Sequence, residues 1–254
     1  MQMYLDTILA ISKRAEEIPK RYFRTKLDVD HKSDASPVTV ADQATEKFIR
    51  DAIGIHFPDH GIFGEEFGET SSDSPYQWII DPIDGTRSFI SGMPLYGMLI
   101  ALLENGVPVL GVVRMPGLDE VYTGSADGAL LNSETSLNTS NKTSLDSAFL
   151  YINEADKILA EAPDVFQKLN TAGQDRRYGY DCYPHMLVAA GHIDACVDYD
   201  LKPYDYMPLT AIVQAAGGVI SDWQGQPLNM ASDGRVISAA TPALHLELLA
   251  LLHD

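Results

Sequence analysis

The stretch from Trp78 to Phe89, WIIDPIDGTRSF, places two carboxylates three residues apart directly after an apolar run. Pro, Asp and Gly are typical of tight turns, so a turn is the simplest interpretation. A simple turn, however, requires neither the second aspartate nor the Thr86 that follows it. Two carboxylates and the carbonyl of Ile83 supply the hard oxygen ligands that suit Mg²⁺. We therefore interpret residues 81–86 as a metal site that holds a phosphate.

The neighbouring residues predict how this motif is held. Residues 78–80 are apolar enough for an interior strand, and we expect the strand to end at Asp81 because Pro82 cannot continue its hydrogen-bond ladder. Asp84 then acts as the N-cap of a helix whose first turn contains Gly85. The free N–H groups and partial positive charge of a helix N-terminus suit a phosphate, and a glycine lets the ligand approach the backbone closely.

Other acids repeat this design at the ends of apolar elements. Glu65 and Glu66 follow the apolar residues 62–63, Asp42 lies in the first turn of its own helix, and Asp205 opens another helix. Taken singly, each of these is more often a capping or solvated acid than a ligand. Placed together they would repel one another strongly, so their convergence would make sense only around cations.

The charge of the chain limits its partners. The sequence has 36 acidic and 18 basic residues, a net charge of −18, which disfavours nucleic acid and anionic membranes as partners. A phosphate substrate would also be repelled unless bound cations reverse the local sign. This requirement favours metal ions over an arginine pocket.

Length and composition indicate an ordinary globular enzyme. A chain of 254 residues can form one large domain or two closely packed ones. No apolar run approaches the ~18 residues of a membrane helix, and the start of the chain has no secretory pattern, so we expect a cytoplasmic protein. We expect Cys182 and Cys196, both in apolar surroundings, to be buried free thiols.

Periodicity and turn residues predict the elements. Residues 2–20 and 39–54 favour helices, and the pattern Thr39-x-x-Asp42 predicts a capping box with Val40 as the first helical residue. Glu-Asn-Gly at 104–106 predicts a β-hairpin.

The pattern changes near residue 143, after which helices and strands alternate. We therefore divide the chain into halves at 1–142, with most candidate ligands, and 143–254, which completes the site. In the second half Asp181 is predicted to cap a helix running through Met186 to Ala190. The fold class expected is an α+β sandwich.

The spacing of the two aspartates disfavours a covalent phosphatase mechanism. Haloacid-dehalogenase-like enzymes use D-x-D-G-T after a strand, with the first aspartate as nucleophile. This chain has D-P-I-D-G-T, with one more residue between the acids. The extra residue would turn the second aspartate onto the wrong face.

The motifs resemble those of the inositol monophosphatase family of Mg²⁺-dependent phosphatases. The resemblance spans nearly the whole chain in order: SPVTVAD at 36–42, GEE at 64–66, WIIDPIDGTRSF at 78–89, PYD at 203–205 and AAGGVISDWQG at 215–225. It implies a layered αβαβα sandwich of the inositol monophosphatase and fructose bisphosphatase type, commonly a homodimer.

The resemblance also implies a mechanism with two or three Mg²⁺ ions. The ligands it implies are Glu65, Asp81, Asp84, Asp205 and the carbonyl of Ile83, with Asp42 assisting a third ion. Glu65 and Thr86 would orient a metal-activated water for in-line attack. The N–H groups of Gly85 and Thr86 would hold phosphate oxygens.

The resemblance implies a small phosphate monoester as substrate. Inositol-specific members usually carry Trp before the last metal-binding aspartate, where this chain has Tyr204, and the run from 178 to 209 is more similar to the histidinol-phosphate phosphatase branch. Asp181 could pair with the ammonium group of histidinol phosphate, with Arg177 and Asp205 as further substrate contacts. The alternatives are an inositol or broad-specificity sugar or nucleotide phosphatase and, more remotely, a non-catalytic metal-binding regulatory protein.

Overall fold

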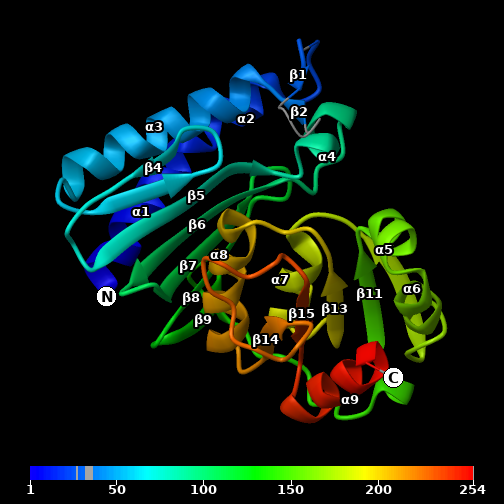
Figure 1. Ribbon diagram of the computed structural model, residues 1–254. Coiled ribbons are helices and arrows are strands. Elements are labelled where there is room, and N and C mark those ends of the chain that lie inside the picture. Colours follow the sequence, from blue (N-terminus) through cyan, green and yellow to red (C-terminus); the bar gives the residue numbers. More distant parts are fainter. Residues whose placement is uncertain (27, 32–36, 254) are drawn as a thin grey trace.

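The computed structural model describes residues 1–26, 28–31 and 37–253, and its chain forms two large sheets, with helices on their outer faces and between them, and one short two-stranded ribbon (Figure 1). Ser36, the first residue of the motif SPVTVAD, lies outside the described residues. The helices are α1 (Gln2–Ala15), α2 (Glu17–Tyr22), α3 (Val40–His56), α4 (Thr86–Ser91), α5 (Ala155–Glu161), α6 (Pro163–Leu169), α7 (Tyr183–Ala189), α8 (Pro203–Ala215) and α9 (Pro242–His253), with a 3-10 turn at Leu145–Ser147.

The larger sheet has eight strands in the order β10-β9-β8-β7-β6-β5-β3-β4. Its pairs are antiparallel except β3 with β5, which are parallel. The strands are β3 (Gly61–Gly64), β4 (Gly68–Thr70), β5 (Tyr76–Asp84), β6 (Gly97–Glu104), β7 (Val107–Met115), β8 (Glu120–Ser125), β9 (Gly128–Leu131) and β10 (Thr135–Ser136). A separate short ribbon pairs β1 (Asp30–His31) with β2 (Pro37–Val38).

The predicted hairpin at 104–106 joins β6 to β7 and is confirmed. Glu104 pairs with Val107, so the loop has two residues, and both adopt positive φ: 51° at Asn105 and 81° at Gly106. Asn and Gly tolerate this left-handed conformation, which is why the dipeptide predicts such a turn.

Helices α1 and α3 cover one face of the larger sheet, where Ile8, Ile49 and Ile53 pack with Trp78 and Ile80. The capping box between Thr39 and Asp42 is present, so α3 begins at Val40 as predicted. The single helix predicted over 2–20 is instead divided at Glu16 into α1 and α2. Pro19 explains the division, because it has no N–H to continue the helical hydrogen bonds.

Helices α7 and α8 lie between the two sheets. On the larger sheet, a Cβ added at Gly111 would lie 2.4 Å from the carbonyl oxygen of Pro208, and one at Gly124 would lie 2.5 Å from the Cα of Ile212. Two glycines on adjacent strands therefore let α8 approach the sheet closely. Val188 of α7 packs with Cys196 of the smaller sheet.

The smaller sheet has five strands in the order β12-β11-β13-β15-β14. Helices α5, α6 and α9 cover its outer face, where Ile158, Leu169 and Leu244 are buried. The strands are β11 (Phe149–Asn153), β12 (Asp175–Gly179), β13 (Ala195–Asp198), β14 (Val219–Asp222) and β15 (Val236–Ala239).

The layers therefore alternate as αβαβα, and the predicted fold class is confirmed (Figure 1). The structural neighbours described below share this fold. Cys182 and Cys196 are buried free thiols, as expected. Within the described part of the chain, no helix is both long enough and apolar enough to cross a membrane.

Candidate metal and phosphate site

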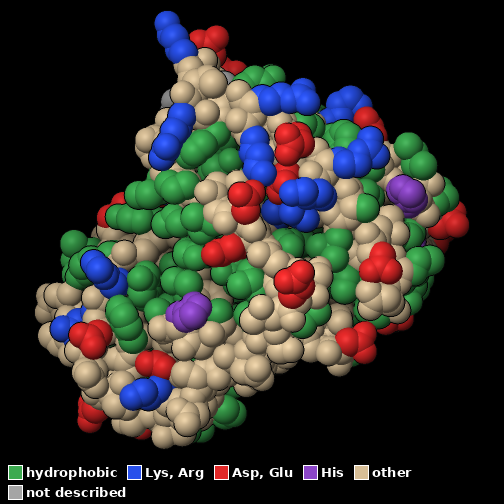
Figure 2. Space-filling view, turned by 180° about the vertical axis from the view of Figure 1, so that it is seen from behind, with side chains coloured by type: hydrophobic (Ala, Val, Ile, Leu, Met, Phe, Trp, Pro, Cys, Tyr) green, Lys and Arg blue, Asp and Glu red, His purple; other side chains and the backbone are tan. Residues whose placement is uncertain are grey.

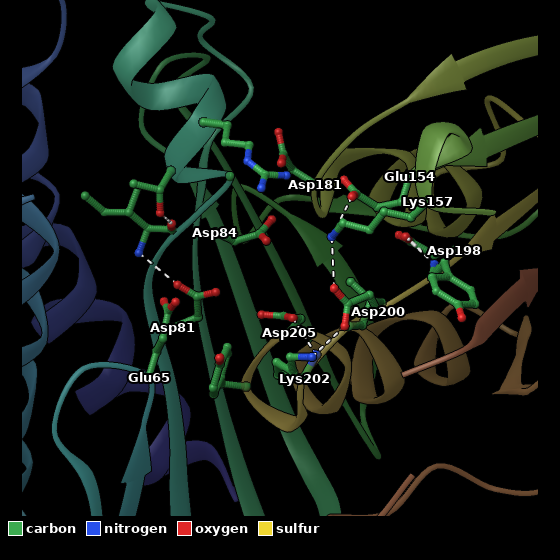
Figure 3. A pocket seen from close by; sticks show the side chains of 17 residues that line it. Glu65, Asp81, Asp84, Glu154, Lys157, Asp181, Asp198, Asp200, Lys202 and Asp205 are labelled. Carbon is green, nitrogen blue, oxygen red and sulfur yellow. Dashed lines mark hydrogen bonds and ion pairs between the residues drawn. The ribbon is translucent and has the colours of Figure 1, made fainter. Parts of the chain in front are cut away.

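A pocket at the end of β5 collects the candidate residues from both parts of the chain (Figure 3). Side chains from β5, α4, α5 and the start of α8 face one another across it. Its lining consists of Glu65, Asp81, Ile83, Asp84, Gly85, Thr86, Arg87, Glu154, Lys157, Asp181, Asp198, Tyr199, Asp200, Leu201, Lys202, Tyr204 and Asp205.

Strand β5 continues to Asp84, so the expectation that it ends at Asp81 is wrong. Asp81 pairs with Leu99 and Asp84 with Gly97, which leaves one extra residue on β5. Pro82 falls in this bulge, where its missing N–H costs no ladder hydrogen bond. The bulge also lets the Asp81 carboxylate accept the N–H of Ile83 at 3.0 Å.

The N-cap of α4 is Gly85 and not Asp84, which corrects a second expectation. Gly85 has φ 78°, in the left-handed region, and a Cβ there would lie 2.5 Å from the Cγ of Asp181. Glycine is therefore required both for the turn and for the close approach of Asp181. The Asp84 carboxylate accepts the N–H of Cys182 at 2.6 Å instead of capping the helix.

Three carboxylates converge in the pocket. Asp81, Asp84 and Asp205 are buried, and one oxygen of each lies within 4.8 Å of the others. Burial, together with the charges of neighbouring acids, raises the pKa values of Asp81 and Asp84 well above the usual range and that of Asp205 to about 7. A divalent cation would relieve this cost, because it stabilises the ionised form of every oxygen ligand. The donor set therefore fits Mg²⁺.

Glu65 follows β3 and lies beside Asp81 in Figure 3. Its backbone N–H donates to the carbonyl of Ile80 at 3.1 Å, and its negative charge contributes to the raised pKa of Asp81. Glu65, on the loop after β3, and Ile83, on β5, both line the pocket together with Asp205 of α8.

Asp42 lies behind the pocket lining and contacts it through Thr86. One carboxylate oxygen accepts the backbone N–H of Thr39 at 2.8 Å and its hydroxyl at 2.6 Å, which completes the capping box. The other oxygen lies 3.3 Å from the hydroxyl of Thr86, which also lies 3.2 Å from the carbonyl of Ile83. Asp42 therefore caps α3 and orients Thr86 at the same time.

Asp181 does not cap a helix, so that interpretation is wrong. Helix α7 begins at Tyr183 with Cys182 as N-cap, and Asp181 itself has φ 61°. Its carboxylate accepts the Ser88 hydroxyl at 2.5 Å, and its carbonyl accepts the side-chain amide of Asn153 at 3.0 Å. Burial, opposed by the Ser88 bond and reinforced by nearby acids, raises its pKa to about 6.

Arg177 is the predicted substrate residue that the pocket does not include. It lies exposed on β12, the edge strand of the smaller sheet, outside the pocket lining. Spacing alone could not distinguish an inward from an outward side chain on this strand.

Sequence reasoning missed Asp198. A signal was available, because Asp198 ends the apolar run of β13, much as Asp81 and Asp205 adjoin apolar elements of their own. Its carboxylate accepts from Nε2 of His185 at 2.9 Å, from Asn153 at 2.7 Å and from the N–H of Tyr199 at 2.8 Å. These bonds fix the wall of the pocket opposite the aspartates.

A row of alternating charges forms the rim of the pocket. Lys157 pairs with Glu154 at 2.8 Å and with Asp200 at 3.0 Å, and Lys202 pairs with Asp200 at 2.6 Å (Figure 3). This rim was also missed, because its members are brought together only by tertiary folding.

Known proteins are similar to this chain in sequence and in fold. The profile of the inositol monophosphatase family matches residues 1–254. A histidinol-phosphatase from Chlorobaculum parvum is 38% identical over 98% of this chain and 96% of its own. The bifunctional chloroplastic phosphatase IMPL2 of Arabidopsis thaliana is 36% identical over 96% of this chain and 73% of its own.

A solved structure of an inositol monophosphatase from Zymomonas mobilis superposes with a TM-score of 0.89 and 36% identity, covering 100% of this chain and 98% of that one. The chain is therefore a phosphatase, a phosphoric monoester hydrolase, and belongs to the inositol monophosphatase family.

Proposed function

We propose that this phosphatase hydrolyses histidinol phosphate to histidinol with Mg²⁺ bound in the pocket. The observation that carries the substrate assignment is Asp181, whose carboxylate lies against Gly85, beside the proposed phosphate position. Among the described residues no ion pair within 4.0 Å includes Asp181, although the charge of Arg87 acts on its carboxylate. A cationic group on the substrate would supply a direct ion-pair partner.

The chain offers enough oxygen donors for two or three Mg²⁺ ions. When bound, the ions would neutralise phosphate charge and make a coordinated water more acidic. The proposed ligands are Glu65, Asp81, Asp84, Asp205 and the carbonyl of Ile83, with Asp42 beside a third ion.

The protein groups have separate proposed tasks. Glu65 accepts a proton from the attacking water, and the Thr86 hydroxyl, fixed by Asp42, orients that water. The N–H groups of Gly85 and Thr86 at the start of α4 hold phosphate oxygens. Asp205 contacts both the cations and the substrate.

Charge complementarity supports an amine-bearing substrate. Histidinol phosphate carries an ammonium group, whereas inositol phosphate carries only hydroxyls besides its phosphate. Asp181 is held from two sides, by Ser88 and Asn153, so little ordering is required when a cation binds. The relative from Chlorobaculum parvum is named a histidinol-phosphatase, which supports the same substrate.

Inositol phosphate is the second candidate, because the similar structure from Zymomonas mobilis is described as an inositol monophosphatase. A neutral polyol would use hydrogen bonds to Asp198 and the charged rim but would give Asp181 no direct ion pair. The two candidates therefore differ in their dependence on Asp181.

The test compares phosphate release from histidinol phosphate and inositol 1-phosphate, with Mg²⁺, by the wild type and Asp181→Ala. We expect the variant to lose about 10²-fold in kcat/KM for histidinol phosphate, because removing one side of a buried charge pair costs several kcal/mol. Activity on inositol phosphate should change little. Equal losses on both substrates would show that Asp181 is only structural, and a wild-type preference for inositol phosphate would overturn the histidinol assignment.

A further inference from the structure

Glu46 is a buried carboxylate on α3 that belongs to no part of the pocket lining. It is 0% exposed and lies one helical turn after Asp42. Its Oε1 accepts the Nε of Arg50 at 2.6 Å, and the Arg50 side chain is itself only 13% exposed. An ion pair buried to this degree requires further hydrogen bonds to offset its desolvation.

Those hydrogen bonds come from the loop that carries Glu65. The carboxylate of Glu46 accepts the N–H of Glu66 at 2.6 Å and the N–H of Phe67 at 3.2 Å. The guanidinium of Arg50 donates to the carbonyl of Gly68 and lies 3.3 Å from the Thr70 hydroxyl. The Glu46–Arg50 pair therefore binds both N–H groups and a carbonyl of the loop backbone.

Gly64 shows how closely the loop is pressed onto this carboxylate. A Cβ at Gly64 would lie 2.1 Å from Oε1 of Glu46, so no side chain fits between them. On the other side, the N–H of Glu65 is held by the carbonyl of Ile80 in β5. Glu65 thus lies between two residues that contact Glu46. Gly64 packs against the Glu46 carboxylate, and the N–H of Glu66 donates to it.

We propose that Glu46, oriented by Arg50, is the positioning residue that fixes the backbone of Glu65 for cation binding. This inference rests on the proposed role of Glu65 as a metal ligand. It also assigns a second task to α3: Asp42 orients Thr86 and, one turn later, Glu46 orients the Glu65 loop. One rigid helix would then set the relative position of the two residues proposed to handle the attacking water.

The chemistry of the contact requires a carboxylate. Two backbone N–H donors and a guanidinium converge on its two oxygens. An amide of the same shape has one oxygen, and its NH₂ would face a donor. Glu46→Gln should therefore release one side of the loop while preserving side-chain volume.

The test measures Mg²⁺ binding without substrate, by calorimetry, together with kcat and KM. The matched control is Glu16→Gln, another buried carboxylate (1% exposed) that pairs with an arginine, Arg114, outside the pocket lining. For Glu46→Gln we expect Mg²⁺ affinity to fall about 10- to 100-fold, the usual effect of losing a partner behind a metal ligand. kcat should fall more than KM rises, and Glu16→Gln should bind Mg²⁺ like the wild type.

Arg50→Lys provides a milder variant in case Glu46→Gln does not fold, and we expect a loss of a few-fold in Mg²⁺ affinity, because lysine keeps the charge but not the fork geometry. If Glu46→Gln and Arg50→Lys both fold and bind Mg²⁺ as tightly as the wild type, the positioning role is overturned while the proposed function stays intact. A wild-type protein that binds no Mg²⁺ would overturn the proposed function, and this inference with it.

Discussion

At the scale of single residues, the site depends on where carboxylates sit relative to a bulge. Asp81 and Asp84 lie three positions apart on β5, and the extra residue at Pro82 changes the face on which the second acid emerges. Three buried acids then share a small volume with raised pKa values, a state that folding tolerates only at a cost in stability. Such a cost is typical of groups retained for chemistry.

Replacing Asp84 with asparagine tests the metal ligands directly. The amide oxygen can still accept the N–H of Cys182, so the variant should fold, but it lacks the negative charge that a cation requires. We expect turnover to fall at least about 10²-fold, in line with a lost electrostatic contact at the reacting group. Phosphate release over a Mg²⁺ titration provides the measurement. A variant with full activity at ordinary Mg²⁺ would refute the ligand role.

Thr86 offers a matched pair of substitutions for the hydroxyl held by Asp42. Thr86→Ser keeps the hydroxyl and should keep most activity, whereas Thr86→Ala should lower kcat about 10²-fold, the scale of a group that assists proton transfer. KM should change less than kcat in both. Steady-state kinetics on one substrate suffices, and equal activity of the two variants would show that the hydroxyl has no catalytic role.

At the scale of elements, close packing of α8 places Asp205. Helix α8 covers the larger sheet over Gly111 and Gly124, and its first turn carries Asp205 into the pocket. A substitution at Gly111 or Gly124 would therefore affect the pocket by displacing α8 as a rigid helix, without touching the pocket directly.

Gly124→Ala should destabilise the protein by about 1–3 kcal/mol, because the added methyl overpacks against the backbone of Ile212. Gly54→Ala is the control, since no atom lies within 4 Å of its added Cβ in α3. There alanine should stabilise by about 0.5–1 kcal/mol. Urea unfolding of both variants gives the comparison, and a neutral Gly124→Ala would show that α8 can shift outward without cost.

His245 links α9 to the smaller sheet through Ser221, with 2.7 Å between Nε2 and the hydroxyl oxygen. Burial lowers the pKa of His245 below its ordinary value of 6.5. The unfolded chain therefore binds more protons near and below pH 6.5, so this contribution to stability is present above that pH and is lost as the pH falls toward the folded pKa. Compared with His245→Gln, the wild type should lose more unfolding free energy between pH 7.5 and 5.5. Parallel pH profiles would contradict this.

At the scale of the whole molecule, local signals were predictable and long-range contacts were not. The capping box at Thr39 and the Asn105-Gly106 turn depend on neighbouring residues, and the structure has both. Residues 81–86 lie together in the pocket, but the bulge at Pro82 depends on pairing with β6. Asn153 and Asp198 are 45 positions apart, and Glu46 and Glu66 are 20 apart, so no local pattern reveals their contacts.

The negative net charge is also distributed unevenly. Figure 2 shows Lys and Arg side chains gathered toward one end of a face of this acidic molecule. The pocket lining itself includes Arg87, Lys157 and Lys202, two of which pair with Asp200. Bound metal ions are therefore not the only positive charges available to offset the acids, because these side chains contribute locally.

The pocket has one wall from residues 65–87 and another from residues 154–205. A cation that bridges these walls ties together segments that are distant along the chain, so ligand occupancy and the melting temperature should rise and fall together. Binding to the folded state alone adds RT ln(1 + [L]/Kd) to stability, about 2.7 kcal/mol at a hundredfold excess over Kd. The acids destabilise the metal-free protein and stabilise it once a cation binds. The melting temperature should therefore report the concentration of cation in the surroundings.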